Sequence, residues 1–227
     1  MKIGVIVPSF SWGVDEAIEV SRAADEAGVD GVFAYDHLWP MNNRSRPAVA
    51  PFPLLAALAQ RFPRLSVGPL VARIGLVENA VLEAQFRALN AIAPGRVIAA
   101  LGTGDSMSAE ENHAYGVAFA SASHRRAALE SCAVVLRDEG LEVWIGGGAA
   151  PTIEIAERNG VALNLWQASV EDVAHRATSC AVTWAGLAPE DDEELASLST
   201  SLREAGATWA VFGNVGAPGR LQDLSRT

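Results

Sequence analysis

The sequence lacks several features that would mark particular classes of protein. It contains only 2 cysteines in 227 residues, Cys132 and Cys180, which lie far apart and form no CxxC pattern, so we expect two buried, reduced thiols. No apolar run is long enough to cross a membrane, and the N-terminal MKIGVIVP is not followed by a signal-peptide cleavage site. These absences lead us to expect a cytoplasmic protein.

Several chemical signatures are missing as well. The sequence has no Gly-x-Ser-x-Gly, no Walker motif and no dinucleotide-binding GxGxxG. Its histidines show no spacing to Cys, Asp or Glu that suggests a ligand set, so no metal is expected. The formal net charge of -10 argues against nucleic acid and against anionic membrane surfaces as partners.

What the sequence does contain is an alternation of strand-like and helix-like segments, clearest between residues 65 and 108. A short run rich in β-branched residues is followed by a helical apolar spacing over 80–93, which Pro94-Gly95 ends. Residues 97–101 are apolar without alternation, as in a strand buried on both faces, and Gly102-Thr103-Gly104 allows a tight turn. This compact unit predicts parallel strands with a right-handed crossover.

The same alternation runs along the whole chain. The predicted strands are 3–7, 32–35, 65–71, 97–101, 143–145, 162–166, 180–184 and 208–212, and the predicted helices are 14–24, 53–60, 80–93, 124–137, 152–158, 169–177 and 191–205. Segment 109–123 reads as a long loop, and the residues after 212 as holding at most one short helix. The pattern predicts an α/β fold, a single (β/α)8 TIM barrel domain over residues 1–227, with a doubly wound open sheet as the alternative.

In such a barrel, functional residues gather on loops that follow the carboxyl ends of strands. Asp36-His37 follows the second strand, and His37 there either moves a proton or orients a ligand, or is a structural histidine held by Asp36. Asp105, after the glycine turn, is either a mouth-facing acid or a helix N-cap. Gly146-Gly147-Gly148-Ala149 either binds a phosphate through backbone N–H groups or is a flexible turn.

Other prominent residues are interpreted structurally. Trp144, Trp184 and Trp209 fall in predicted strands and are expected to pack the core or the barrel. His124-Arg125-Arg126 is expected to be a solvated helix start rather than an anion clamp.

Four stretches resemble the luciferase-like monooxygenase family, and within it the actinobacterial oxidoreductases that use the deazaflavin coenzyme F420. They are AGVDGVFAYDHLWP, PLVARIGLVENAVLEAQFRALNAIAPGRVIAALGTGD, AEENHAYGVAF and VWIGGGAAPTIEIAERNGVALNLW, in the order found in the family. The resemblance implies a TIM barrel with a flavin or deazaflavin at its C-terminal mouth. It also implies hydride transfer between F420 and a small organic substrate.

The resemblance further implies roles for individual residues. Asp36-His37 matches the pair that lies against the deazaflavin ring, and the Leu70-Val71 region matches a bulge behind the ring, where relatives often have a non-prolyl cis peptide. The implied coenzyme-binding residues are Asp36, His37, Leu70, Val71, Ala72, Gly102, Thr103, Gly104, Gly147, Gly148 and Ala149. The last three would hold the phosphate-bearing tail, and His37 and Asp105 would be the catalytic residues that manage the proton.

The chain also departs from the family pattern. The step from Leu136 to Val143 is short, the long insertion after the seventh strand is missing, and the eighth helix is nearly absent. No Lys or Arg of the later strands matches the family's phosphate-binding cation. An FMN-dependent monooxygenase and a barrel that binds a ligand or partner without turnover are therefore the alternatives. A homodimer is compatible with the family.

Overall fold

The computed structural model describes residues 1–40, 43–105, 108–222 and 224. Its strands are β1 (Lys2–Ile6), β2 (Gly31–Ala34), β3 (Ser66–Pro69), β4 (Ala72–Arg73), β5 (Ile98–Gly102), β6 (Glu142–Gly146), β7 (Ala162–Trp166), β8 (Val182–Leu187) and β9 (Ala207–Gly213). Its helices are α1 (Asp15–Glu26), α2 (Pro51–Arg61), α3 (Asn79–Ile92), α4 (Ser108–Ala114), α5 (Ala122–Asp138), α6 (Ala150–Asn159), α7 (Val170–Arg176), α8 (Asp192–Glu204) and the 3-10 turn η1 (Pro218–Leu221).

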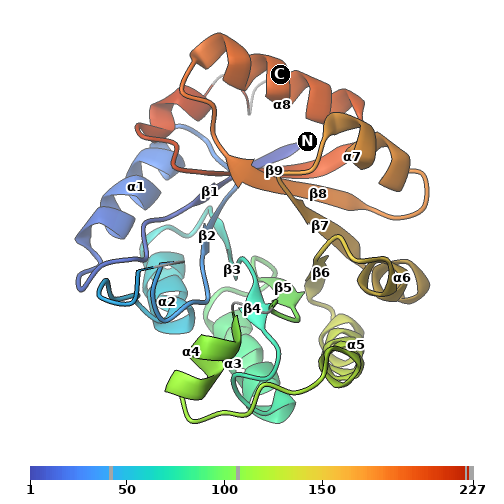
Figure 1. Cartoon of the computed structure of the whole chain (residues 1–227). Helices are drawn as coiled ribbons and strands as arrows, with labels where there is room; N and C mark the ends of the chain where they lie inside the picture. The colour runs from blue at the N-terminus through green and yellow to red at the C-terminus, as the bar shows by residue number, and fades with distance from the viewer. Residues whose placement is uncertain (41–42, 106–107, 223, 225–227) are drawn as a thin grey trace.

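All the strands belong to one parallel sheet that closes on itself. The strand order is β3-β2-β1-β9-β8-β7-β6-β5-β4, so the two ends of the sheet are segments that follow one another in the chain. A parallel bridge between Val67 and Val97 joins β3 to the residue just before β5. Figure 1 shows the helices arranged around the outside of the strands. The TIM barrel prediction is confirmed, and the open doubly wound sheet is wrong.

The third barrel strand is interrupted, which is why it appears as two elements. The peptide bond between Leu70 and Val71 is cis. Before it, β3 pairs with β2, and Leu70 N donates to Ala34 O at 2.8 Å. After it, Ala72 and Arg73 pair with β5 instead. The predicted strand over 65–71 therefore lies in the right place but continues two residues further, after a bulge.

Two apolar cores hold the barrel together. The larger one lies between the sheet and the surrounding helices. The smaller one fills the barrel lumen, where the ring of Trp144 lies 5.3 Å from Phe33 and 5.5 Å from Trp209 between centroids. Gly4 makes room for this cluster, because a Cβ there would lie 2.7 Å from the Phe33 ring. The packing role expected for the tryptophans is confirmed, with Trp184 belonging to the outer core.

One predicted element is wrong. Helix α4 covers residues 108–114 and so overlaps 109–123, where a loop was expected. The buried residues of α4 are Ser108, Glu111 and Asn112, so the helix has no apolar periodicity that would reveal it. In Figure 1 it lies near β4, at the part of the barrel that carries the candidate site.

The last part of the chain adds one short element to the barrel. The η1 turn is the short helix expected after residue 212. None of the helices in the described ranges is long and apolar enough to cross a membrane. Among the same residues, no group of three or more His, Cys, Asp or Glu side chains is placed to hold a metal ion.

Candidate functional site

A group of charged side chains lies where β2 and β4 end and α4 begins. Arg73 N donates to Asp36 Oδ2 at 2.9 Å, and Arg73 Nε donates to Asp36 O at 3.0 Å. Glu111 of α4 reaches back to the loop after β2, with its Oε1 3.0 Å from His37 Nδ1 and its Oε2 accepting from Leu38 N at 3.2 Å. Arg73 Nη2 lies 2.6 Å from Glu111 Oε2. These four residues tie three separate segments together at the barrel mouth.

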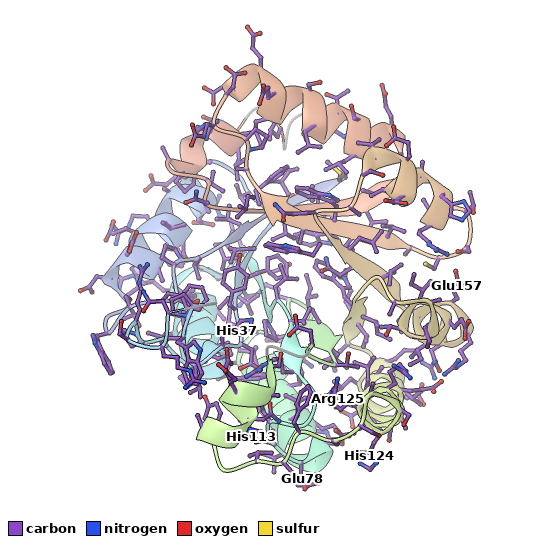
Figure 2. The ribbon with its side chains drawn as sticks, viewed as in Figure 1. His37, Glu78, His113, His124, Arg125 and Glu157 are labelled. Atoms are coloured by element: carbon purple, nitrogen blue, oxygen red, sulfur yellow. The ribbon has the colours of Figure 1, made fainter. Side chains whose placement is uncertain are left out.

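This cluster is largely shielded from water. The side chains of Arg73 and Glu111 are each 5% exposed, whereas that of His37 is 26% exposed. In Figure 2, His37 lies between the barrel and α4, the helix that carries His113. Within the described residues, neither Nη1 nor Nη2 of Arg73 makes a hydrogen bond, so the Arg73 charge is balanced through its ion pair with Glu111 and the nearby Asp36.

The environment shifts the pKa values of the Asp36 and Glu111 carboxyl groups in opposite directions. Burial raises the pKa of Asp36 above its ordinary value, although the Arg73 N–H and charge oppose the shift. Burial also acts to raise the pKa of Glu111, but the His37 hydrogen bond and the Arg73 charge outweigh it, and the pKa is lowered. Glu111 is therefore the ionised member of the pair, and Asp36 is the one that holds a proton more readily.

An ionised Glu111 determines how His37 is used. A carboxylate can only accept hydrogen bonds, so His37 Nδ1 carries the proton that is donated to Glu111 Oε1. In the neutral imidazole, Nε2 is then the basic nitrogen. No hydrogen bond joins Nε2 to another described residue. The structure thus brings Asp36 and His37 together as expected, but the residue that orients His37 is Glu111 rather than Asp36.

The bulge at Leu70–Val71 lies against two glycines of neighbouring strands. A Cβ at Gly102 would be 2.4 Å from Val71 Cγ2, and one at Gly146 would be 2.9 Å from Val71 Cγ1. Real Cβ atoms do not come this close, so only glycine leaves Val71 its place. Ala72 is buried next to this contact. The predicted bulge residues and the two glycine loops therefore meet at one point.

The Thr103 loop is held from behind by Arg125 of α5. Arg125 is 8% exposed, its Nε donates to Thr103 O at 2.8 Å, and a second guanidinium nitrogen donates to Ala120 O. Burial, followed by the charge of Arg126, lowers the pKa of Arg125. Figure 2 shows Arg125 between α4 and α5. The expectation that Arg125 is part of a solvated helix start is therefore wrong.

Asp105 lies at the exposed end of this loop. Its Oδ1 accepts from Ser108 N at 3.2 Å, and its own N–H donates to Ser108 Oγ at 3.2 Å. These reciprocal bonds are typical of a helix cap and place Asp105 at the start of α4. Gly104 adopts φ +65°, which allows the sharp turn that brings the capping groups together. The geometry matches the N-cap interpretation, and the acid role of Asp105 stays a prediction.

The glycine loop after β6 leads into α6. Gly147 has φ +138°, and its N–H donates to Asn164 O at 3.2 Å. Gly148 has open space around it, since a Cβ there would meet nothing within 4 Å. The N–H groups of Gly148 and Ala149 take part in no described backbone hydrogen bond and precede a helix N-terminus, a combination suited to an anion.

Aromatic side chains form another part of the mouth. Phe10, from the loop after β1, stacks on Tyr35 with 5.4 Å between ring centroids and 13° between planes. Tyr35, just past β2, meets Trp166 at the end of β7 at 6.2 Å. Strands β1, β9 and β8 stand between β2 and β7, so this contact reaches across the opening.

Sequence reasoning missed three residues of this site. Arg73 follows a bulge and Arg125 belongs to an arginine pair, and neither context separates a buried guanidinium from a solvated one. Glu111 is one of two adjacent glutamates in a segment that was read as a loop. The one available signal was its position in AEENHAYGVAF, a stretch that resembles the family.

Residues 1–138 match the model of the luciferase-like monooxygenase family. An F420-dependent glucose-6-phosphate dehydrogenase of Intrasporangium calvum is 29% identical over 138 residues, which are 60% of this chain and 41% of that protein. The namesake from Beutenbergia cavernae is 38% identical over 108 residues, 47% of this chain and 32% of that protein. The chain thus spans less than half the length of these curated relatives.

Solved structures resemble the whole chain. An F420-dependent secondary alcohol dehydrogenase, solved with an F420-acetone adduct, aligns with a TM-score of 0.82 at 14% identity and covers 98% of this chain and 97% of its own. The F420-dependent tetrahydromethanopterin reductase of Methanopyrus kandleri aligns at 0.77 with 10% identity, over 99% of this chain and 98% of its own. A monooxygenase of Streptomyces bottropensis reaches 0.76 at 14% identity, over 99% and 97%. At these identities the likeness establishes the fold.

Proposed function

Because this chain belongs to the luciferase-like monooxygenase family, we propose that it is an F420-dependent oxidoreductase acting on a small organic substrate. When bound, the deazaflavin coenzyme supplies or accepts the hydride. The names of the curated relatives and of two structural neighbours support this choice over FMN.

The residues present fit such a coenzyme. Val71, seated on Gly102 and Gly146, offers an apolar surface for one face of a planar ring. Gly102, Thr103 and Gly104 would lie along the ring edge, and Arg125 fixes the carbonyl side of that loop. The N–H groups of Gly148 and Ala149, which make no backbone hydrogen bond within the described residues, suit the phosphate of the tail and compensate for the missing Lys or Arg. Leu70, Ala72 and Asp36 complete the support behind the ring.

The proton that accompanies hydride transfer falls to His37 and Asp105. His37 is held through Nδ1, so its Nε2 accepts or returns a proton without the ring rotating. Asp105, fixed by Ser108, is the second proton-handling group at the loop edge. The observation that carries the proposal is the fixed His37 at the same barrel end as the Val71 bulge, where Asp36 contacts Arg73 just after the bulge, because this end then offers both a ring platform and a proton-transfer group.

The test is a fluorescence titration of the purified protein with F420 and, in parallel, with FMN. We expect saturable F420 binding that is lost in Gly148→Asp, whose new carboxylate repels the phosphate in the open space beside the loop. Gly13→Asp is the matched control, since Gly13 also has nothing within 4 Å and lies after β1, away from β6 in the strand order. His37→Ala is expected to slow turnover more than it weakens binding.

Each outcome separates the candidates. FMN binding without F420 binding would replace the proposal with a flavin-dependent monooxygenase. F420 binding without turnover of any substrate would favour the non-catalytic barrel. Equal loss of binding in Gly148→Asp and Gly13→Asp would remove the phosphate assignment.

Three further expectations belong to the proposal. We treat residues 1–227 as one barrel domain with a small-molecule substrate. A homodimer and a cytoplasmic location stay predictions, to be checked by size-exclusion chromatography with light scattering and by cell fractionation.

A further inference from the structure

We propose that the substrate of this site is an uncharged, largely apolar molecule that carries a hydrogen-bond-accepting oxygen. This inference rests on the proposed function, since the substrate is the hydride partner of the coenzyme. The substrate would lie against Phe10, Tyr35, Trp166 and Leu187, with its oxygen on the Tyr35 hydroxyl.

The aromatic side of the mouth adjoins the candidate catalytic histidine. The Tyr35 ring lies 6.4 Å from the His37 ring, and the Phe10 ring lies 6.5 Å from it. Trp166 is 47% exposed and Leu187 is 50% exposed, although both stand at the ends of barrel strands. An apolar molecule placed here would cover these side chains and lie within reach of His37, and covering apolar area favours binding.

Tyr35 provides the polar contact within this apolar surface. Its hydroxyl makes no hydrogen bond to any described residue. Burial raises the pKa of Tyr35 to about 12, so the group is a neutral phenol that can donate to an oxygen. A Cβ at Gly213 would lie 3.3 Å from Tyr35 Oη and 3.6 Å from Leu187 Cδ2, so the glycine keeps the space between them open.

The charges around the mouth argue against a phosphorylated or anionic substrate. The loops 167–169 and 188–191, which follow Trp166 and Leu187, contain no Lys or Arg, and the second contains Glu190 and Asp191. Arg220 is held by Asp192 and by the carbonyls of Val215, Pro189 and Glu190. An anion placed against Trp166 and Leu187 would face Glu190 and Asp191 with no Lys or Arg in these two loops to balance them, which disfavours its binding there.

The arginines of the loop after β2 do not change this conclusion. Arg44 pairs with Glu110 at 2.6 Å and lies over the ring of Trp39. Arg46 Nε donates to Phe10 O at 2.7 Å, which fixes the Phe10 loop. Both cations are therefore engaged in holding the rim of the mouth.

The experiment uses three probes with the coenzyme-loaded protein: acetophenone, ethylbenzene and glucose 6-phosphate. Saturation-transfer NMR measures binding of each, and coenzyme fluorescence on the same samples measures loading. We expect acetophenone to bind at least about tenfold more tightly than glucose 6-phosphate. Tyr35→Phe should weaken acetophenone by about threefold to tenfold, the loss of one neutral hydrogen bond, and leave ethylbenzene unchanged.

A second pair of variants tests the aromatic surface. Trp166→Ala should weaken both acetophenone and ethylbenzene by about tenfold, because both lose the same stacking area. Trp12→Ala is the matched control, since Trp12 is 90% exposed and makes no described ring contact. This variant should bind acetophenone and ethylbenzene as the wild type does.

Failure of the inference and failure of the proposed function give different results. Tighter binding of glucose 6-phosphate than of acetophenone, or an equal effect of Tyr35→Phe on acetophenone and ethylbenzene, would overturn the inference while coenzyme binding stands. Absence of coenzyme binding, with Tyr35-dependent acetophenone binding retained, would overturn the proposed function and leave a binding site of the stated chemistry. Binding of neither would overturn both.

Discussion

Replacing Glu111 with glutamine would test the charged cluster most directly. The wild-type carboxylate receives the N–H groups of His37 and Leu38 and faces the Arg73 guanidinium at 2.6 Å. Every group that points at it is a donor or a cation. Glutamine keeps the shape, but its NH2 group is itself a donor, so at least one of these contacts is lost along with the negative charge.

The expected cost follows from the burial of the ion pair. Both side chains are 5% exposed, and removing one member of a buried pair costs about 3–5 kcal/mol. Asp36, which accepts a hydrogen bond from the Arg73 N–H, still balances part of the Arg73 charge. The substitution also creates no cavity. We therefore expect a loss at the lower end, about 3 kcal/mol of the free energy of unfolding.

Urea unfolding monitored by tryptophan fluorescence would measure this loss. The control is Glu110→Gln, the adjacent residue, whose pair with Arg44 has side chains that are 64% and 63% exposed. Such a surface pair contributes about 0–1 kcal/mol, so the control should unfold near the wild type. The Glu111→Gln protein should bind F420 but turn over slowly, because His37 loses the partner that fixes its tautomer.

The pH dependence of the free energy of unfolding tests the role of Glu111 independently. The pKa of Glu111 is lowered on folding, so its contribution is present above the ordinary glutamate pKa and is lost as pH falls through the folded value. Glutamine does not titrate, so the difference in free energy of unfolding between the wild type and Glu111→Gln should become smaller as the solution becomes acidic. The raised pKa of Asp36 acts in the opposite direction, but its largest cause is burial, which the substitution leaves in place. Equal stability of the Glu111 and Glu110 variants at neutral pH would refute the reasoning.

Three further predictions concern other parts of the mouth. Gly102→Ala should cost about 1–3 kcal/mol in urea unfolding and weaken coenzyme binding, because its methyl group would lie 2.4 Å from Val71 Cγ2. Arg125→Met should cost about 2 kcal/mol by leaving two carbonyls unpaired, whereas Arg126→Met should change stability by less than about 0.5 kcal/mol; similar losses would contradict the role given to Arg125. In an ultraviolet pH titration, the tyrosinate signal that Tyr35→Phe removes should appear only near pH 12, and its appearance near pH 10 would show that Tyr35 is not buried.

The barrel could be predicted from the sequence because its strands are short apolar runs with clear ends. The predicted strand 162–166 coincides with β7, and predicted helix 80–93 differs from α3 by one residue at each end. Helix α4 could not be predicted in the same way, since its buried face is polar. Its place is determined by contacts to Leu38 and Arg73, residues far away in the chain.

The candidate site also contains some residues that could be predicted from the sequence and others that could not. Single positions after strand ends, such as His37 and Gly102, could be predicted because a parallel barrel gathers those ends at one face. The partners of these positions could not. Glu111 meets His37 across 74 residues and Arg125 meets Thr103 across 22, and no local pattern encodes such pairings.

The filled lumen described for the barrel has a consequence for kinetics. Phe33, Trp144 and Trp209 close the interior below the mouth, so nothing passes through the barrel from end to end. Coenzyme and substrate must then enter and leave by the same face. Whichever lies deeper has to arrive first and depart last, so the barrel imposes an order on the reaction cycle before any chemistry takes place.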